Sequence, residues 1–163
     1  MPRVVLYQPQ IPPNTGNVAR TCAATGTELH LIEPLGFTIS DRHLRRAGLD
    51  YWPFVSLVCH GDLEAFQQHR RRQGGRLVAL SSRADAAYTD FDFLADDWLL
   101  FGRETDGLPT ALQATADARL GIPMARSARD AAGGVRSLNL SVSVGIVLFE
   151  ALRQLGAHAG VRD

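Results

Sequence analysis

The feature that most constrains the fold of this chain is a series of short apolar runs separated by stretches of helical character. The runs are rich in the branched and aromatic side chains that buried strands favour. They cover residues 4–7, 29–32, 77–80, 98–101 and 119–122. Because strands that alternate with helices pair in parallel, the chain is predicted to form an α/β fold, a parallel sheet flanked by helices.

Capping residues and glycines predict where the helices begin and end. Helices are expected to begin after residue 14 or 17, after 40, after 62, after 109 and near 139, with Asn14, Ser137 and Asn139 as natural caps. Gly26, Gly48, Gly74 and Gly156 are placed to end four of them. The last helix, residues 140–155, carries a wide apolar stripe and must pack against a large part of the core.

Length and composition predict one domain, residues 1–163, because the chain suffices for one core and is too short for two ordinary domains. The amino terminus enters a strand pattern without a secretory signal, which favours the cytoplasm. No apolar run approaches the ~18 residues of a membrane helix. The five histidines and two cysteines lack zinc-ligand spacing, so no metal site is expected.

Three polar clusters stand where strands should meet helices. They are residues 14–20 (NTGNVAR), 101–109 (FGRETDGLP) and 137–141 (SLNLS). In an open α/β sheet ligands bind at the carboxyl ends of the strands, so the three clusters are predicted to form one site. The chain has neither the Gly-x-x-x-x-Gly-Lys of a Walker A loop nor a Gly-x-Gly-x-x-Gly dinucleotide fingerprint after a strand, which argues against ATPase and Rossmann oxidoreductase functions.

In order and spacing, the three clusters resemble the SPOUT superfamily of S-adenosylmethionine-dependent RNA methyltransferases, in its 2′-O-ribose branch. The resemblance spans almost the whole chain. Residues 6–17, 32–37 and 44–51 look like the small single-domain enzymes of that branch that methylate the wobble pyrimidine ribose, position 34 of the tRNA anticodon. The resemblance implies a deep carboxyl-terminal trefoil knot, a homodimer with the active site at the subunit contact, S-adenosylhomocysteine as product, and a tRNA anticodon stem-loop as partner.

The resemblance also implies roles for individual residues. The catalytic set is Asn14, Arg20, Glu104 and Asn139, and the residues that hold the cofactor are Leu80, Gly102, Ile122 and Ser137. Arg20 is expected about one turn into its helix. A guanidinium keeps its proton up to pH ~12, so stabilising a developing alkoxide is a better role for it than that of general base. Glu104 follows a strand end, where a carboxylate has no evident structural purpose.

The net charge of zero gives no basic footprint for RNA, but local charge does. Arg42, Arg45 and Arg46 stand three and four residues apart on a predicted short helix, so they would share one face. We expect this face to contact the RNA.

Two departures from the family pattern affect the site. Val142 replaces a usual asparagine, and residues 125–135 form a longer loop. The alternatives are 2′-O-methylation of another RNA, either ribosomal RNA or another tRNA site, and a catalytically silent RNA-binding dimer. The intact catalytic set, together with Ser137, argues against a silent protein.

Overall fold

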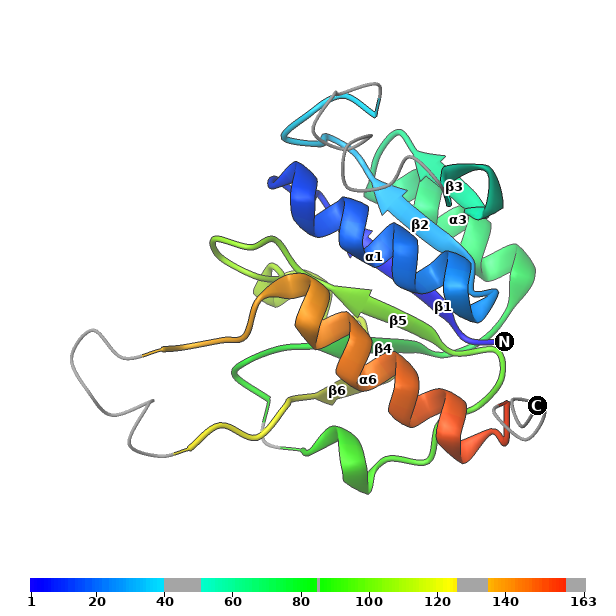
Figure 1. Cartoon of the computed structure of the whole chain (residues 1–163). Coiled ribbons are helices and arrows are strands. Elements are labelled where there is room, and N and C mark those ends of the chain that lie inside the picture. Colours follow the sequence, from blue (N-terminus) through cyan, green and yellow to red (C-terminus); the bar gives the residue numbers. More distant parts are fainter. Residues whose placement is uncertain (40–50, 85, 126–134, 158–163) are drawn as a thin grey trace.

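A computed structural model of the chain describes residues 1–39, 51–84, 86–125 and 135–157. Its centre is one six-stranded sheet in which every neighbouring pair is parallel (Figure 1). The strands are β1 (Arg3–Tyr7), β2 (Leu29–Ile32), β3 (Leu57–His60), β4 (Leu77–Leu80), β5 (Trp98–Phe101) and β6 (Ala118–Leu120), in the order β3-β2-β1-β5-β4-β6. The prediction of a parallel α/β sheet is confirmed.

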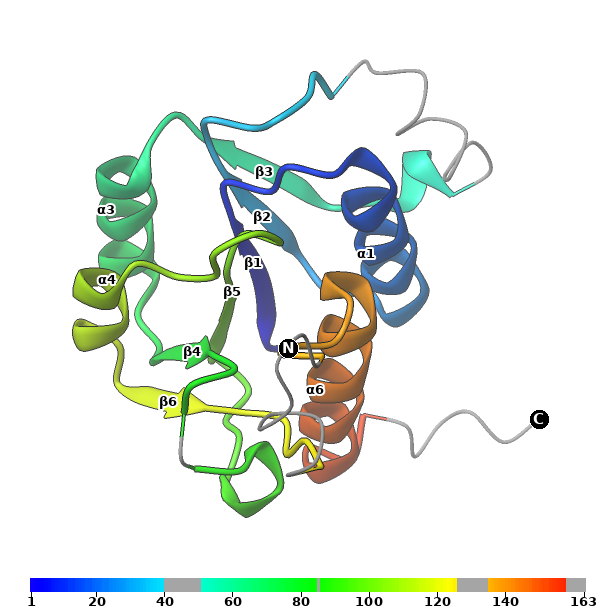
Figure 2. The same cartoon turned by 90° about the vertical axis from the view of Figure 1, so that its left-hand side faces the viewer.

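Helices cover both faces of the sheet, which gives three layers (Figure 2). Helices α1 (Pro12–Thr25) and α6 (Leu140–Gln154) lie side by side on one face. Helices α3 (Leu63–Gln73) and α4 (Thr110–Ala114) cover the other face. Two short 3-10 helices, η1 (Trp52–Phe54) and η2 (Tyr88–Asp90), complete the described elements.

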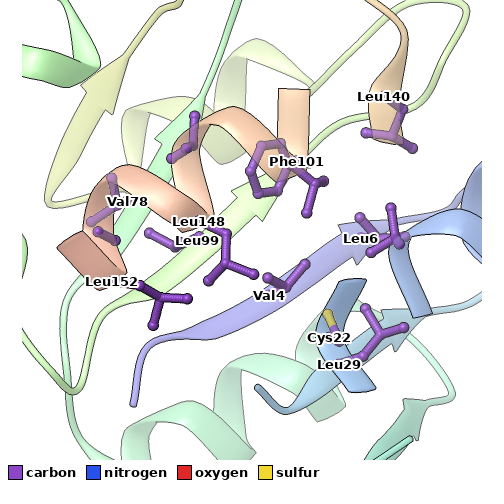
Figure 3. Packing of buried hydrophobic residues seen from close by; sticks show 14 of the residues in the cluster. Val4, Leu6, Cys22, Leu29, Val78, Leu99, Phe101, Leu140, Leu148 and Leu152 are labelled. Carbon is purple, nitrogen blue, oxygen red and sulfur yellow. The ribbon is translucent and has the colours of Figure 1, made fainter. Parts of the chain in front are cut away.

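The core lies in two layers because successive side chains of a strand point to opposite faces. In β1, Val4 and Leu6 pack beneath α1 and α6, whereas Val5 and Tyr7 face the other way. Figure 3 shows the first layer, where Leu148 and Leu152 of α6 come down on the strands. The apolar stripe predicted for the last helix therefore packs against the core.

The helix boundaries agree with the predictions at α3 and α6. The Asp62 carboxylate accepts a hydrogen bond from the Ala65 amide (2.7 Å), and the Asn139 side chain accepts one from the Ser141 amide (2.9 Å). Asn139, not Ser137, is the cap of α6. Gly26 and Gly74 end α1 and α3 with positive φ.

The start of α1 differs from the prediction. The helix begins at Pro12, with Ile11 at the N-cap position and no side-chain cap, so Asn14 lies inside the helix. Proline suits the first helical positions because it lacks the amide hydrogen that would need a partner there. The prolines therefore start the helix, and the Asn14 side chain bonds elsewhere.

Some predictions fall outside the described residues. The helix expected to begin after residue 40 and to end at Gly48 is among them, as is the predicted arginine face. Residues 126–134, on the path into α6, also lie outside, so the trefoil knot stays a prediction, as does the single domain of residues 1–163. Within the described ranges, no helix has the length and apolar character needed to span a membrane.

Candidate active site

A cavity of about 490 Å³ opens at the carboxyl ends of three strands. Its walls include Leu80 at the end of β4, Phe101 at the end of β5 and Leu120 at the end of β6. The start of α6 and the loop of residues 102–108 close it further. This is the edge where open α/β sheets bind ligands.

Seven residues assigned to the site from sequence line this cavity. They are Asn14, Leu80, Gly102, Glu104, Ile122, Ser137 and Asn139. Residues from all three polar clusters, far apart in sequence, therefore line one cavity, and Asn14 is the member of the first cluster among them. The roles assigned to the individual residues stay predictions.

Asn14 and Asn139 join the two helices that meet at the cavity. The Asn139 amide nitrogen donates to the Asn14 side-chain oxygen over 2.9 Å. The Asn139 oxygen in turn accepts from the backbone amide and the hydroxyl of Ser141 (2.9 and 2.7 Å). The first turns of α1 and α6 are thus held at a fixed separation.

Glu104 has structural partners that the sequence did not reveal. Its two carboxylate oxygens accept hydrogen bonds from the backbone amides of Gln10 (2.9 Å) and Ile11 (3.0 Å). A carboxylate is favourable here because the amides before and within the first turn of a helix lack other acceptors. Glu104 therefore fixes the chain that leads into α1.

Gly102 is required by the backbone of its own loop. A Cβ at this position would lie 2.3 Å from the Gly107 carbonyl carbon and 2.4 Å from the Leu108 nitrogen. Arg103 and Gly107 pair across the loop through both backbone hydrogen bonds, which brings the chain back over Gly102. Gly102 lines the cavity, but a side chain at this position would first contact the backbone of Gly107 and Leu108.

Arg20 lies apart from the cavity lining. It is the ninth residue of α1, more than two turns from the helix start, because the helix begins earlier than predicted. Its side chain is exposed, and its guanidinium carbon lies 5.7 Å from the centre of the Tyr51 ring. The Tyr51 hydroxyl donates to the Gly16 carbonyl (2.7 Å), which docks η1 against α1 beside Arg20.

Sequence reasoning missed three cavity-lining arginines, Arg83, Arg103 and Arg136. Arg103 lies within a recognised cluster and Arg136 directly precedes another, so their positions next to the motifs were the available signal. Glu104 and Asp106 also line the cavity, so the carboxylates offset most of this positive charge. Arg42, Arg45 and Arg46 lie outside the described residues.

A parallel α/β sheet with a cavity at its strand ends is typical of the class of enzymes that bind a small organic molecule at that edge. More specifically, the chain belongs to the SpoU rRNA methylase family, whose model matches residues 1–149. The sequence-based resemblance to RNA 2′-O-methyltransferases is therefore confirmed.

Similar proteins extend over nearly the whole chain. One, from Beijerinckia indica, is named tRNA (cytidine(34)-2′-O)-methyltransferase; it is 49% identical over 160 residues, covering 98% of this chain and 96% of the relative. A solved structure concerning the 2-OH methylation of C/U34 on tRNA has a TM-score of 0.87 at 50% identity, covering 96% of this chain and 97% of the other.

A third neighbour is an AdoMet-bound rRNA methyltransferase from Sinorhizobium meliloti. It has a TM-score of 0.82 at 29% identity and covers 94% of this chain and 56% of its own.

Proposed function

We propose that this chain transfers a methyl group from S-adenosylmethionine to the 2′-hydroxyl of the pyrimidine ribose at position 34 of tRNA. The observation that carries the proposal is that three clusters distant in sequence line one cavity at the strand ends. The relative named tRNA (cytidine(34)-2′-O)-methyltransferase and the solved structure on C/U34 methylation support the substrate. A tRNA substrate also favours the cytoplasm.

The cavity fits the cofactor. Its volume of about 490 Å³ lies within the range of roughly 300–1,000 Å³ that is usual for sites of this kind. Leu80 and Ile122 offer apolar walls to the adenosine, and Ser137 offers a hydroxyl. When bound, S-adenosylmethionine supplies an electrophilic methyl group, and S-adenosylhomocysteine remains as the product.

The contribution of the protein is positioning and charge. Methyl transfer needs the hydroxyl in line with the methyl group, and fixed orientation alone lowers such a barrier by several kcal/mol. The bond between Asn14 and Asn139 and the Glu104 carboxylate hold the elements that would orient the two reactants. Arg20 stabilises the developing alkoxide, because a guanidinium keeps its proton and cannot accept the one that leaves. That proton passes to an RNA phosphate or to water.

The exposed position of Arg20 favours a homodimer as the active form. Arg20 is absent from the lining of its own cavity, so it would reach the ribose held at the partner's cavity. Helix α6 also exposes about half of Val142 and of Phe149. Apolar side chains of this kind are typical of subunit contacts.

The alternatives are methylation at another tRNA site or of ribosomal RNA, and a silent RNA-binding dimer. Incubation with tritiated S-adenosylmethionine and total tRNA from a strain lacking the gene, followed by nucleoside mapping, separates them. Label should appear in 2′-O-methylated pyrimidine at position 34. Label at another position would identify a different substrate, and RNA binding without label would identify a silent protein.

A further inference from the structure

The cavity loop of residues 102–108 is tied to the start of the chain by side chains that no site assignment includes. Arg103 donates from Nη1 to the Gln8 side-chain oxygen (3.0 Å), and the Thr105 hydroxyl donates to the Gln10 side-chain oxygen (2.8 Å). We call these two bonds the loop latch. Gln8 and Gln10 lie in the segment between β1 and α1, so the latch joins a cavity wall to the helix that carries Asn14 and Arg20.

Among the latch residues, Arg103 is the one that could be mistaken for a ligand-binding residue. As a cation that lines the cavity, it invites assignment to the cofactor carboxylate or to an RNA phosphate. Each of its three guanidinium nitrogens already donates a hydrogen bond within the protein, however. Nε and Nη2 donate to the two Asp106 oxygens (2.8 Å each), Nη1 donates to Gln8, and the guanidinium carbon lies 5.5 Å from the centre of the Tyr7 ring.

Gln8 supplies a second observation. Among the described residues, Gln8 is the one non-glycine residue whose backbone has a positive φ, at 45°. Such a conformation persists where surrounding contacts hold it, and it is concentrated at functional sites. The bond from Arg103 is one such contact, and Gln8 turns the chain from β1 toward the cavity.

We propose that Arg103 is a positioning residue that acts on methyl transfer through Gln8, rather than a ligand for the cofactor or the RNA. This inference rests on the proposed function. The latch keeps the cofactor wall and the start of α1 in one arrangement, so breaking it misaligns the methyl group and the ribose. It leaves the contacts that bind each reactant in place.

The test compares four variants on an anticodon stem-loop with a wobble pyrimidine. Gln8→Met and Arg103→Met should each lower kcat about tenfold while KM for the RNA and the Kd for S-adenosylhomocysteine stay within about twofold. The double variant should be no worse than Arg103→Met alone, because the bond to Gln8 is already absent in that variant. Arg103→Lys should not restore kcat, because lysine keeps the positive charge but lacks the planar guanidinium that donates to Asp106 and Gln8 at the same time.

Arg153→Met is the matched control. Arg153 makes the same two-pronged contact with Glu150 on α6, at 2.8 and 2.9 Å, without lining the cavity, and its loss should leave kcat unchanged. The inference is overturned if Gln8→Met has wild-type kcat, if Arg103→Lys is as active as wild type, or if Arg103→Met mainly weakens binding. A salt dependence of RNA binding reduced by about one unit would make Arg103 a phosphate ligand instead.

The latch and the proposed function can fail separately. A folded wild-type protein that methylates no stem-loop overturns the function. The latch is then tested by thermal unfolding without RNA, where the loss of Tm in the double variant should equal the loss in Arg103→Met alone. Additive losses of Tm would show that Arg103 and Gln8 do not act together.

Discussion

At the scale of the residue, most polar groups assigned to the site have partners within the protein. Asn14 and Asn139 bond to each other, and Glu104 binds two backbone amides. These side chains therefore build the site, and few groups are left to meet the reacting atoms. Arg20 is exposed and lies outside the cavity lining, so its action on the RNA stays a prediction.

Arg20→Ala should abolish turnover with little change in cofactor affinity, because Arg20 does not line the cofactor cavity. Loss of a charge that stabilises the transition state costs roughly 10²–10³ in kcat. Single-turnover methylation of the stem-loop and calorimetry with S-adenosylhomocysteine measure the two effects. Arg72→Ala, at an exposed position on α3, is the control for loss of one positive charge. Wild-type turnover by Arg20→Ala would refute the catalytic role.

A buried imidazole cluster predicts a pH dependence of stability. The Nδ1 of His30 lies 3.0 Å from the Nε2 of His60, and the His69 ring packs against both rings. Burial lowers the pKa of His30 to about 4, against the opposing hydrogen bond with Glu28, and His60 and His69 lower it further. Burial also lowers the pKa of His60. Both rings are therefore neutral in the folded protein at neutral pH.

The free energy of unfolding should fall as pH decreases from about 6.5 toward 4. Over this window the His30 ring is protonated in the unfolded chain but stays neutral in the folded protein. The loss attributable to His30 between pH 7.5 and 5 is about 2 kcal/mol. Urea unfolding at the two pH values measures it. The double variant His30→Gln/His60→Gln should show a smaller pH dependence, and an equal one would contradict the assignment.

At the scale of the element, most strand ends and most helix starts could be predicted. β2, β4 and β5 have the predicted bounds because each is a short run of mostly apolar residues, nearly all of them buried. β3 was missed: it is an edge strand whose Cys59 is exposed and whose buried residue is His60, so its pattern is weak. The strand expected at 119–122 is β6, which ends at Leu120 and leaves Ile122 to line the cavity.

The site could be predicted as a set of positions but not as a set of contacts. Motif order identified seven of the lining residues, because a parallel sheet brings strand ends together. Other contacts depend on how loops distant in sequence pack together. They are the bonds of Glu104 to backbone amides, the bond of Arg103 to Gln8, and the position of Tyr51 beside Arg20. Local sequence patterns carry no information on that packing.

Gly102→Ala should disturb the loop at the end of β5 before it touches the cofactor. The added methyl group would meet the backbone of Gly107 and Leu108, and relief of such crowding costs about 1–3 kcal/mol. Both Tm and the affinity for S-adenosylhomocysteine should fall. Gly145→Ala is the control, since a Cβ there meets nothing within 4 Å. If Gly102→Ala lowers affinity at unchanged Tm, the crowding falls on the cofactor alone.

At the scale of the whole molecule, the protein is expected to be a homodimer in solution. Light scattering at micromolar concentration should give twice the chain mass of 17.7 kDa. A monomer that retains methyltransferase activity would contradict the proposed arrangement. Val142→Asp, which places a charge on the exposed face of α6, should weaken association.

Mixed dimers show whether Arg20 acts across the interface. A dimer of one Arg20→Ala and one Glu104→Ala subunit keeps one complete site if Arg20 serves the partner's cavity, and none if it serves its own. Activity should therefore reappear when the two inactive homodimers are mixed and exchange subunits. Failure to recover activity, with exchange verified by mass spectrometry, would place Arg20 at its own cavity.

The order of the strands has a consequence for synthesis on the ribosome. β1 pairs with β2, which follows it closely, and also with β5, where Val4 faces Leu99. At translation rates of roughly 5–20 residues per second, the 95 residues (99 − 4) between these partners take about 5–20 s to emerge. During those seconds the strand destined for the interior of the sheet has an open edge, which can pair with other chains. The cavity forms later still, because it needs Ser137 and Asn139.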